Sequence, residues 1–513
     1  MQESTSKYET KSSSAFLWVS LLLCAVLCCF HCWLYWPGFI LDDAQTTLVL
    51  DKAGWHPAIM AYLLEIAYSF FGIHVYNLFL LSMIPFYTGI WLIIYSAYLK
   101  TKSWFSLLLI FPCFIGNITY TVIKLGSVSF SVSWICLLYA LTLYAVVNPP
   151  AKDTKKIFYG FYGVVFMIAL LGRQNAVLQI WPITFVWIGQ YLATKNLSFW
   201  KYASHFILWA FLSGIASGLL LIGGTKAISK SDKGDVYPAT LIVMHQIVGM
   251  CAPEMDESCF DPDWWYGYWA HDPHLMENLK LQYEEYYDDA EIFSLSYDPE
   301  VAFKYFTDLK GRYSKWWYAF TKYPGNFFKH VGFFYSELWT MSPDLFLPEE
   351  LLEEFTPKRM IKHASIWHPL STREQERIKK IAYQIPTDEL RLTWGDKEYK
   401  ADNFVRTYFP AFHAYVFIGI CVILMIVGIC LFIRTRTNLL YLLLISTSWG
   451  GFLSSLIIPL FAPRIFSRYM EPVYFCAVFS LQIFVLILML NKQSIIMYVK
   501  NRFCSLKKVR ENK

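Results

Sequence analysis

Two adjacent carboxylates, Asp42 and Asp43, are the residues whose type and position most directly suggest chemistry. They follow the first long apolar run of the chain, and Trp55-His56-Pro57 comes soon after them. One carboxylate can accept a proton from an attacking hydroxyl, and a second can orient the acceptor or hold a cation. The alternative is a solvated helix cap, because Asp is favoured at the start of a helix. The pair therefore marks either a reacting centre or a helix end.

Four basic residues stand at the ends of apolar runs, on the same side as the acid pair. They are Lys124, Arg173, Arg464 and Arg468. The phosphate of a lipid would supply an anionic partner for charges at this level. The alternatives are snorkelling of the long side chains to lipid headgroups and pairing with acids such as Glu471.

Three further residues could contact an acceptor or a sugar. His56 could bind an acceptor or a metal ion, although a lone His is more often a hydrogen-bonded structural residue. Trp264 and Trp265 lie in a run of aromatic and acidic residues from Asp261 to His271. Aromatic faces stack on sugar rings, but a Trp and Tyr belt against the bilayer would explain the same residues.

The elements that must position these residues are predicted from apolar runs of about 20 residues, the length that crosses about 30 Å of hydrocarbon. Ten such runs fall at 14–36, 74–98, 104–121, 127–147, 157–172, 176–193, 202–224, 411–433, 438–460 and 472–490. We therefore expect an all-α polytopic membrane protein with about ten transmembrane helices. Residues 41–72 are too polar to cross the membrane, and we expect two short interfacial helices there.

The distribution of Lys and Arg predicts the orientation of these spans. With a cytoplasmic N-terminus, 18 basic residues lie on the inner side, and only five lie on the outer side apart from residues 225–410. Residues 225–410 carry 21 basic and 30 acidic residues, a net charge of −9. Both termini are therefore expected in the cytoplasm, and the acid pair outside it. The basic tail is then a signal for orientation and for anionic lipid rather than a nucleic-acid arm.

This orientation divides the chain into four parts. Residues 1–224 form a seven-span catalytic module, 225–410 an extracytoplasmic domain, 411–491 three more spans, and 492–513 a cytoplasmic tail. The extracytoplasmic domain is expected to be mainly helical, with helices at 277–292, 299–321, 348–354 and 371–383. Cys251 and Cys259 are its only cysteines. An even pair in an oxidising compartment predicts a disulfide rather than a metal site.

Several known motifs are absent from the sequence. It contains no Walker A sequence, dinucleotide-binding glycine pattern, HExxH or GxSxG. Few acids lie within the expected spans, so an ion-coupled relay through the bilayer is poorly supported.

The order of these features resembles the GT-C class of integral-membrane glycosyltransferases, which includes protein O-mannosyltransferases and the bacterial transferases that add aminoarabinose to lipid A. In that class an acidic pair follows the first span, two interfacial helices precede the second, and a larger outer loop follows the seventh. Asp42-Asp43, residues 56–62 and the segment from 225 occupy those places. Leu171 to Ala176 is similar to an Arg-containing turn of bacterial members. Arg464 to Pro472 is similar to an Arg-Tyr-x-x-Pro element before a late span.

The resemblance implies an inverting transferase that uses a polyprenyl-phosphate-linked sugar. Asp42 would be the base with Asp43 in support, and Lys124, Arg173, Arg464 and Arg468 would hold the donor phosphate. Many members have Asp-Glu where this chain has Asp-Asp, which leaves open which acid is the base. Metal dependence is also open, because oligosaccharyl-type members use a divalent metal ion and mannosyl-type members do not. Asp42 and Asp43 would be the ligands of such an ion.

We therefore expect sugar transfer to a cell-envelope glycan, lipid or protein, such as lipopolysaccharide, at the periplasmic face of a bacterial inner membrane. One rival is an O-antigen polymerase or ligase, which also uses outer arginines but does not require an acid pair after the first span. A second rival is not an enzyme but a flippase for a lipid or glycan. A flippase should need polar residues through the bundle, and the sequence offers few.

Overall fold

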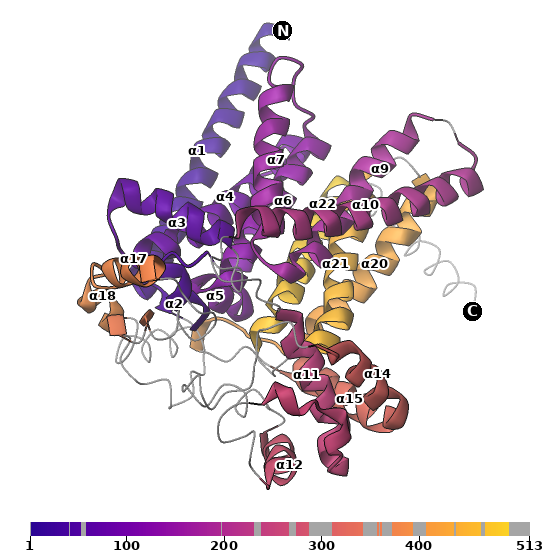
Figure 1. Cartoon of the computed structure of the whole chain (residues 1–513). Coiled ribbons are helices and arrows are strands. Elements are labelled where there is room, and N and C mark those ends of the chain that lie inside the picture. The colour runs from indigo at the N-terminus through magenta and orange to yellow at the C-terminus, as the bar shows by residue number, and fades with distance from the viewer. Residues whose placement is uncertain are drawn as a thin grey trace.

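The computed structural model describes residues 2–40, 42–52, 58–195, 197–229, 238–265, 273–286, 310–341, 356–358, 360–361, 372–392, 407–435, 438–462 and 467–491. For residues 2–13, 39–40, 42–43, 238–239, 241, 282, 284–286, 390–392 and 467 this description covers the backbone alone. Figure 1 shows the long helices gathered in one bundle, with a smaller group of helices attached at one end. The described residues confirm the expected all-α polytopic membrane fold.

Within the described residues, eight helical segments are long and apolar enough to cross a membrane. They are Ser14–Tyr35 of α1 (Gln2–Tyr35), α4 (Tyr76–Thr101), α6 (Ser127–Val147), the stretch Gln174–Ala193, α10 (Phe199–Ile228), α20 (Ala414–Thr435), α21 (Leu439–Phe461) and α22 (Glu471–Leu490). The stretch Gln174–Ala193 is built from η2 (Gln174–Ala176), α8 (Val177–Ile180), η3 (Trp181–Ile183) and α9 (Thr184–Ala193).

Two of the ten expected spans take a different form. The run at 104–121 is divided into η1 (Trp104–Phe114) and α5 (Gly116–Ile123), which are bent by 67° relative to each other. Pro112 lies next to this break and lacks the N–H that a continuous helix needs. The run at 157–172 forms α7 (Lys155–Leu171), a helix of only 17 residues. All ten apolar runs are therefore helical, and two are broken or short.

Close packing of α4 against α6 forms the centre of the bundle. A Cβ atom added at Gly89 of α4 would lie 2.9 Å from the Cys136 sulfur and 3.1 Å from the Leu137 nitrogen of α6. The first turns of α6 carry four buried serines, Ser127, Ser129, Ser131 and Ser133. Small residues of this kind let helix backbones approach in a membrane, where lipid tails remove the usual hydrophobic drive for association.

The smaller group contains α11 (Pro238–Cys251), α12 (Leu275–Tyr286), α14 (Arg312–Lys322) and α15 (Pro324–Thr340). The helices expected at 277–292 and 299–321 correspond to α12 and α14, whereas the one at 348–354 lies outside the described residues. Helices α11 and α15 were not expected. The group has its own hydrophobic core, so we call it the outer helical group.

Side-chain hydrogen bonds attach the outer helical group to the end of α21. Gln246 donates to the Leu460 carbonyl at 2.9 Å, and the Trp339 indole donates to the Ser455 carbonyl at 3.1 Å. Gln246 also accepts from the indole of Trp316 at 2.7 Å. These bonds join α11, α14 and α15 to one end of the spanning bundle.

Cys251 and Cys259 form a disulfide in the structure, the pairing that the sequence led us to expect. Within the loop that it closes, the Asp256 carboxylate accepts hydrogen bonds from Ser258, Lys322 and Tyr323. Burial raises the pKa of Asp256, but the hydrogen bonds outweigh it and lower the pKa to about 2. The loop is thereby fixed to α14 and to the start of α15.

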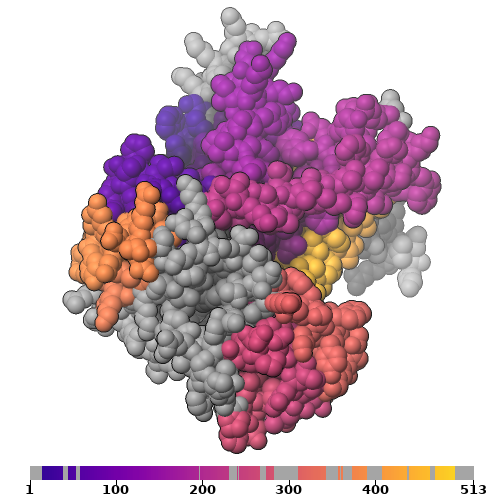
Figure 2. All heavy atoms as spheres, in the orientation of Figure 1, coloured from indigo at the N-terminus to yellow at the C-terminus, as the bar shows by residue number. Residues whose placement is uncertain are grey.

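A further pair of helices, α17 (Thr372–Ala382) and α18 (Thr387–Leu392), covers the region after the first span. The region consists of α2 (Asp42–Leu48) and α3 (Ala58–Phe71). Arg377 donates to the Leu50 carbonyl at 3.2 Å, and Glu389 accepts from the Val75 amide at 2.7 Å. Figure 2 shows α17 and α18 in orange beside the indigo N-terminal segments. Residues more than 300 positions apart in sequence are therefore neighbours here.

A buried histidine links three helices of the outer helical group. His330 of α15 is buried, its Nδ1 lies 2.7 Å from the Tyr283 hydroxyl of α12, and its ring centroid lies 4.7 Å from that of His245 of α11. Burial, with a smaller contribution from the charge of His245, lowers the pKa of His330 well below its usual value. Below about pH 6.5 the folded state then binds fewer protons than the unfolded chain, so stability is lost as the pH falls.

Acidification from about pH 7.5 to about pH 5.5 should therefore weaken this group, by up to about 1.4 kcal/mol for each pH unit below the unfolded pKa. Amide hydrogen exchange in α11 and α15, corrected for its intrinsic pH dependence, would measure the change. The His330→Asn variant does not titrate and should show a flatter dependence on pH. An equally steep loss of protection in that variant would assign the effect to other groups.

Candidate functional site

A short pair of parallel strands brings the segment before the acid pair beside Lys124. Strand β1 (Phe39–Ile40) pairs with β2 (Lys124–Leu125), and Phe39 lies opposite Lys124. Helix α2 then begins at Asp42, so the Cα atom of Asp42 lies within about 7 Å of that of Ile40. The side chains of Asp42 and Asp43 are outside the described part of the chain. Their backbone begins two residues after the strand that pairs with β2.

Helix α2 is covered by protein rather than resting on a lipid surface. Its residues Ala44 to Leu48 are all buried. The Tyr68 hydroxyl of α3 donates to the Leu48 carbonyl at 3.0 Å. Helix α3 keeps an exposed apolar side that includes Phe70 and Phe71. Two helices were expected at the membrane interface. Helix α3 has the exposed apolar side that an interfacial helix needs, whereas α2 is buried inside the protein.

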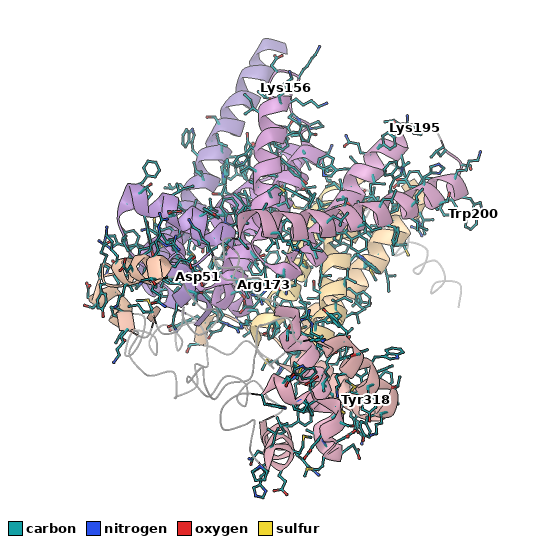
Figure 3. All side chains as sticks on the ribbon, viewed as in Figure 1. Asp51, Lys156, Arg173, Lys195, Trp200 and Tyr318 are labelled. Atoms are coloured by element: carbon teal, nitrogen blue, oxygen red, sulfur yellow. A yellow bond between two sulfur atoms is a disulfide. The ribbon has the colours of Figure 1, made fainter. Side chains whose placement is uncertain are left out.

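The basic residues expected at the outer ends of spans converge around Tyr469. The guanidinium carbons of Arg173 and Arg468 lie 5.9 Å and 5.7 Å from the centre of the Tyr469 ring. Arg173 also donates to the Ser127 hydroxyl at 2.8 Å. Figure 3 labels Arg173 on the side of the bundle that faces the outer helical group. Three segments far apart in sequence therefore meet at one place.

Lys124 pairs with Glu471, which follows Tyr469 by two residues in the chain. The Lys124 ammonium donates to Glu471 Oε1 at 2.9 Å, and the two side chains are only 7% and 2% exposed. This is the pairing that the sequence allowed as an alternative to phosphate binding. We call Lys124, Arg173, Arg468, Tyr469 and Glu471 the cation cluster.

Local breaks in the helices position the cluster. Lys124 follows the bent pair η1 and α5, Arg173 follows the end of α7, and Arg468 and Tyr469 lie in η9 (Ser467–Tyr469) before α22. The break before Lys124 is held by Asn117, whose amide donates to the Phe412 carbonyl and accepts from the Phe412 N–H, both at 2.8 Å. Because spans end here, charged side chains can gather at the edge of the bundle without crossing hydrocarbon.

Ser127 and Tyr469 were not predicted as site residues, and Glu471 was considered only as a counter-ion. For Tyr469 and Glu471, the one sequence signal for a place in the site is their position beside Arg468 in the Arg-Tyr-x-x-Pro element. Ser127 carries no signal of its own, because a serine at the start of a helix is common.

The expected sugar-binding role of Trp264 and Trp265 is contradicted by their burial. Their exposed fractions are 2% and 8%, and both pack in the core of the outer helical group. Their ring faces are covered by protein and cannot stack on a sugar from solvent. The sequence run was misleading because buried and exposed Trp residues look alike in a polar segment. His56 and Arg464 lie outside the described residues and remain predictions.

The described side chains include no group of three or more His, Cys, Asp or Glu that could hold a metal ion. Asp42 and Asp43 are not among them, so a metal ion at the acid pair stays a prediction.

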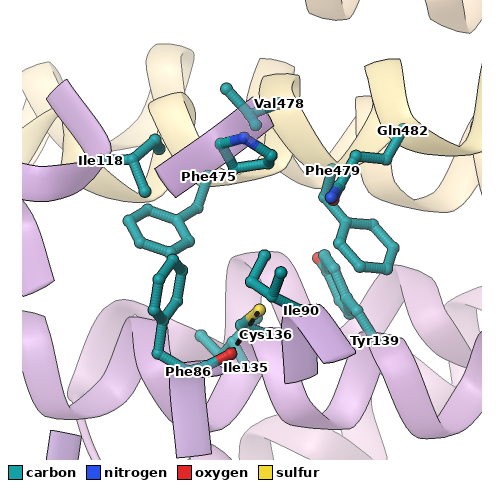
Figure 4. Close-up of a pocket in the computed structure, with 11 residues that line it drawn as sticks. Phe86, Ile90, Ile118, Ile135, Cys136, Tyr139, Phe475, Val478, Phe479 and Gln482 are labelled. Atoms are coloured by element: carbon teal, nitrogen blue, oxygen red, sulfur yellow. Dashed lines mark hydrogen bonds between the residues drawn. The ribbon is translucent and has the colours of Figure 1, made fainter. Parts of the chain in front are cut away.

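A small apolar cavity lies in the bundle between α4, α6 and α22 (Figure 4). Its volume of about 20 Å³ suits a single water-sized group. This cavity is too small for an isoprenoid tail or a sugar.

The fold and the site together define a polytopic all-α membrane protein with a cation cluster at one edge of its bundle. No family model and no curated protein matches the chain. Among solved structures, the crystal structure of ArnT from Cupriavidus metallidurans bound to undecaprenyl phosphate is similar over 93% of this chain and 78% of that one. The sequence identity is 9% and the TM-score is 0.27. A likeness of this degree supports no conclusion about the activity of this chain.

Gly38 controls how closely β1 approaches β2. Its φ is +98°, and a Cβ atom there would lie 2.8 Å from Leu125 Cδ2 and 2.9 Å from Phe79 Cδ2. Gly38→Ala should therefore displace β1 and lower the free energy of unfolding by about 1–3 kcal/mol. A disulfide between cysteines placed at Ile40 and Leu125 should form readily when Gly38 is kept. The Leu125 change removes one of the two close contacts, but the contact with Phe79 Cδ2 at 2.9 Å and the positive φ of Gly38 remain to oppose an alanine there. Its yield should fall to less than half in the Gly38→Ala background.

Mass spectrometry of unreduced peptides would measure the yield. Gly160→Ala is the matched control, because a Cβ atom there meets nothing within 4 Å. Equal cross-linking in the Gly38→Ala and Gly160→Ala backgrounds would show that Gly38 does not set the strand pairing.

Proposed function

We propose that this chain is an inverting membrane glycosyltransferase that moves a sugar from a polyprenyl-phosphate donor to an envelope glycan, lipid or protein. The observation that carries the proposal is the pairing of β1 with β2. This pairing puts the segment that leads into the acid pair beside Lys124, and Lys124 contacts Glu471. Arg173 and Arg468 lie against the ring of Tyr469, two residues before Glu471 in the chain. A base and a phosphate-binding group are the two parts that such a reaction needs.

In the proposed reaction, Asp42 accepts the proton of the acceptor hydroxyl as its oxygen attacks the anomeric carbon of the sugar. The bond between that carbon and the phosphate oxygen breaks, and its electron pair leaves with the polyprenyl phosphate. Arg173 and Arg468 stabilise the charge that develops on the phosphate. Asp43 orients the acceptor, or binds a divalent metal ion together with Asp42.

Orientation supports this assignment. Lys156 and Lys195 are expected in the cytoplasm, and Figure 3 labels them far from Arg173 and from Tyr318 of the outer helical group. The proposed site then faces the periplasm of a bacterial inner membrane, where lipid-linked sugars rather than nucleotide sugars would be the donors.

The first test concerns the base. Asp42→Asn keeps the size of the side chain but removes the proton acceptor, so transfer should slow by about 10²–10⁴-fold. Binding of the donor should persist, because the phosphate contacts lie on other residues. Asp43→Asn should slow transfer less, unless a metal ion joins the two acids, in which case a chelator should have the same effect as either change.

The assay is sugar transfer from a polyprenyl-phosphate donor by purified protein in detergent, with donor binding measured in parallel. Normal transfer by folded Asp42→Asn protein would return the acid pair to the role of a helix cap. It would also favour the polymerase or ligase alternative, which does not require these acids.

The second test concerns the phosphate. Arg173 and Arg468 are half-buried, so Arg173→Ala and Arg468→Ala should each weaken donor binding by about 2–5 kcal/mol if the bound donor excludes water from the site. Lys at either position should restore the affinity only in part, because the planar guanidinium is lost. Lys156→Ala is the matched control, since it removes one exposed cation at a distant end of the bundle. Donor affinity equal to wild type in both Arg variants would contradict the assignment.

A further inference from the structure

Five aromatic side chains of α14 and α15 form one contiguous group on the outer helical group. They are Trp316, Trp317, Phe320, Phe327 and Phe328, whose neighbouring ring centroids lie 5.2–5.7 Å apart. Trp317 and Phe328 are 60% and 64% exposed, whereas the other three are partly buried against the core of the group. We call these five residues the aromatic patch. Large apolar side chains that gather at a surface mark a place of contact.

The patch lies close to one end of a membrane span. Helix α21 has 23 residues and is therefore about 35 Å long, close to the thickness of the hydrocarbon layer. Gln246 donates to the carbonyl of Leu460 in the last turn of α21 and accepts from the Trp316 indole. Figure 1 shows α14 and α15 beyond the ends of α20 and α21. One side chain thus separates Trp316 from the point where α21 leaves the bilayer.

The two sides of α14 have different partners. Phe320 and Trp317 lie about 40° and 100° around the helix from Trp316 in one direction, and Lys315 and Lys322 about 100° and 120° in the other. Lys315 donates to the carbonyls of Ser258 and Phe260, and Lys322 donates to Asp256. The disulfide loop therefore occupies the lysine side of α14, and Trp317 stands on the opposite side.

The local charge favours an anionic surface. Residues 312–336 contain four basic and no acidic residues, although residues 225–410 as a whole have a net charge of −9. Lys329 is exposed and directly follows Phe328. Aromatic rings next to basic side chains are typical of protein at the level of the lipid headgroups, where anionic lipids attract the positive charge.

We propose that the aromatic patch rests in the headgroup layer of the leaflet at which α21 ends. Trp317 and Phe328 insert between the lipids, and Lys329 contacts lipid phosphate. The patch thereby holds the outer helical group against the membrane. This inference requires only the membrane-spanning bundle and is independent of the proposed sugar transfer.

Fluorescence quenching in nanodiscs tests the proposal. An environment-sensitive fluorescent amino acid is placed at Trp317 or Phe328 of the full-length protein, in a mixture of phosphatidylglycerol and phosphatidylethanolamine. Leu281 of α12 is the matched control, because it is 55% exposed and α12 lies at the far end of the outer helical group (Figure 1). Nitroxide-labelled lipids should quench the fluorophore at Trp317 and Phe328, and aqueous iodide should not. At Leu281 the two quenchers should have the opposite effects.

A second measurement concerns Lys329. With the fluorophore at Phe328, quenching by nitroxide-labelled phosphatidylglycerol is compared with quenching by the phosphatidylcholine analogue. Lys329→Gln should lower the preference for the anionic lipid about fivefold, as expected for one basic residue at an anionic membrane surface. Lys380→Gln, which removes an exposed lysine of α17, is the control and should leave the preference unchanged.

Two results would overturn the proposal. Iodide quenching at Trp317 and Phe328 as strong as at Leu281, without quenching by lipid nitroxides, would show that the patch faces water. Protection from both quenchers would show that protein covers it, and loss of that protection at one chain per nanodisc would identify the cover as a second copy. A preference for anionic lipid that survives Lys329→Gln would remove Lys329 from the contact.

Discussion

The buried contact between Lys124 and Glu471 is the interaction on which the rest of the site depends. It joins β2 to the first residue of α22, and β2 in turn pairs with the strand that precedes the acid pair. One contact therefore fixes the positions of segments that are 347 residues apart in sequence. Because both side chains are buried, removal of either one alone would leave an uncompensated charge inside the protein.

The membrane imposes the second constraint, since hydrocarbon offers no partner for an open backbone N–H or C=O group. The described spans meet it with hydrogen bonds within helical segments, and where η1 breaks from α5 the neighbouring chain supplies the partners. The Gly116 amide donates to the Pro410 carbonyl at 2.9 Å, and the side chain of Asn117 bonds both backbone groups of Phe412. The bend that presents Lys124 is thus compensated by the segment that leads into α20.

The sequence predicted the helices of the bundle well and the contacts of the site poorly. Apolar runs of spanning length are a local property, so all ten appear as helical segments in the structure. The bend next to Pro112 was missed because a single proline hardly changes the mean hydropathy of the run. Helix α15 was missed because its aromatic residues have modest helix propensity. The burial of Trp264 and the pairing of Lys124 with Glu471 depend on tertiary packing, which the local sequence does not reveal. No local pattern states which of several polar residues will be covered.

The sequence did identify the basic side chains that lie at the outer ends of spans, against the usual excess of Lys and Arg on the cytoplasmic side. Positive residues at the outer ends of spans are unfavourable for orientation, so their presence requires a compensating partner. For Lys124 the structure supplies Glu471, and for Arg173 it supplies Ser127 and the face of Tyr469. A neutral hydroxyl and an aromatic ring orient a guanidinium without cancelling its charge, whereas a carboxylate cancels it. These two contacts of Arg173 orient its guanidinium, whereas the contact of Lys124 pairs its ammonium with the carboxylate of Glu471.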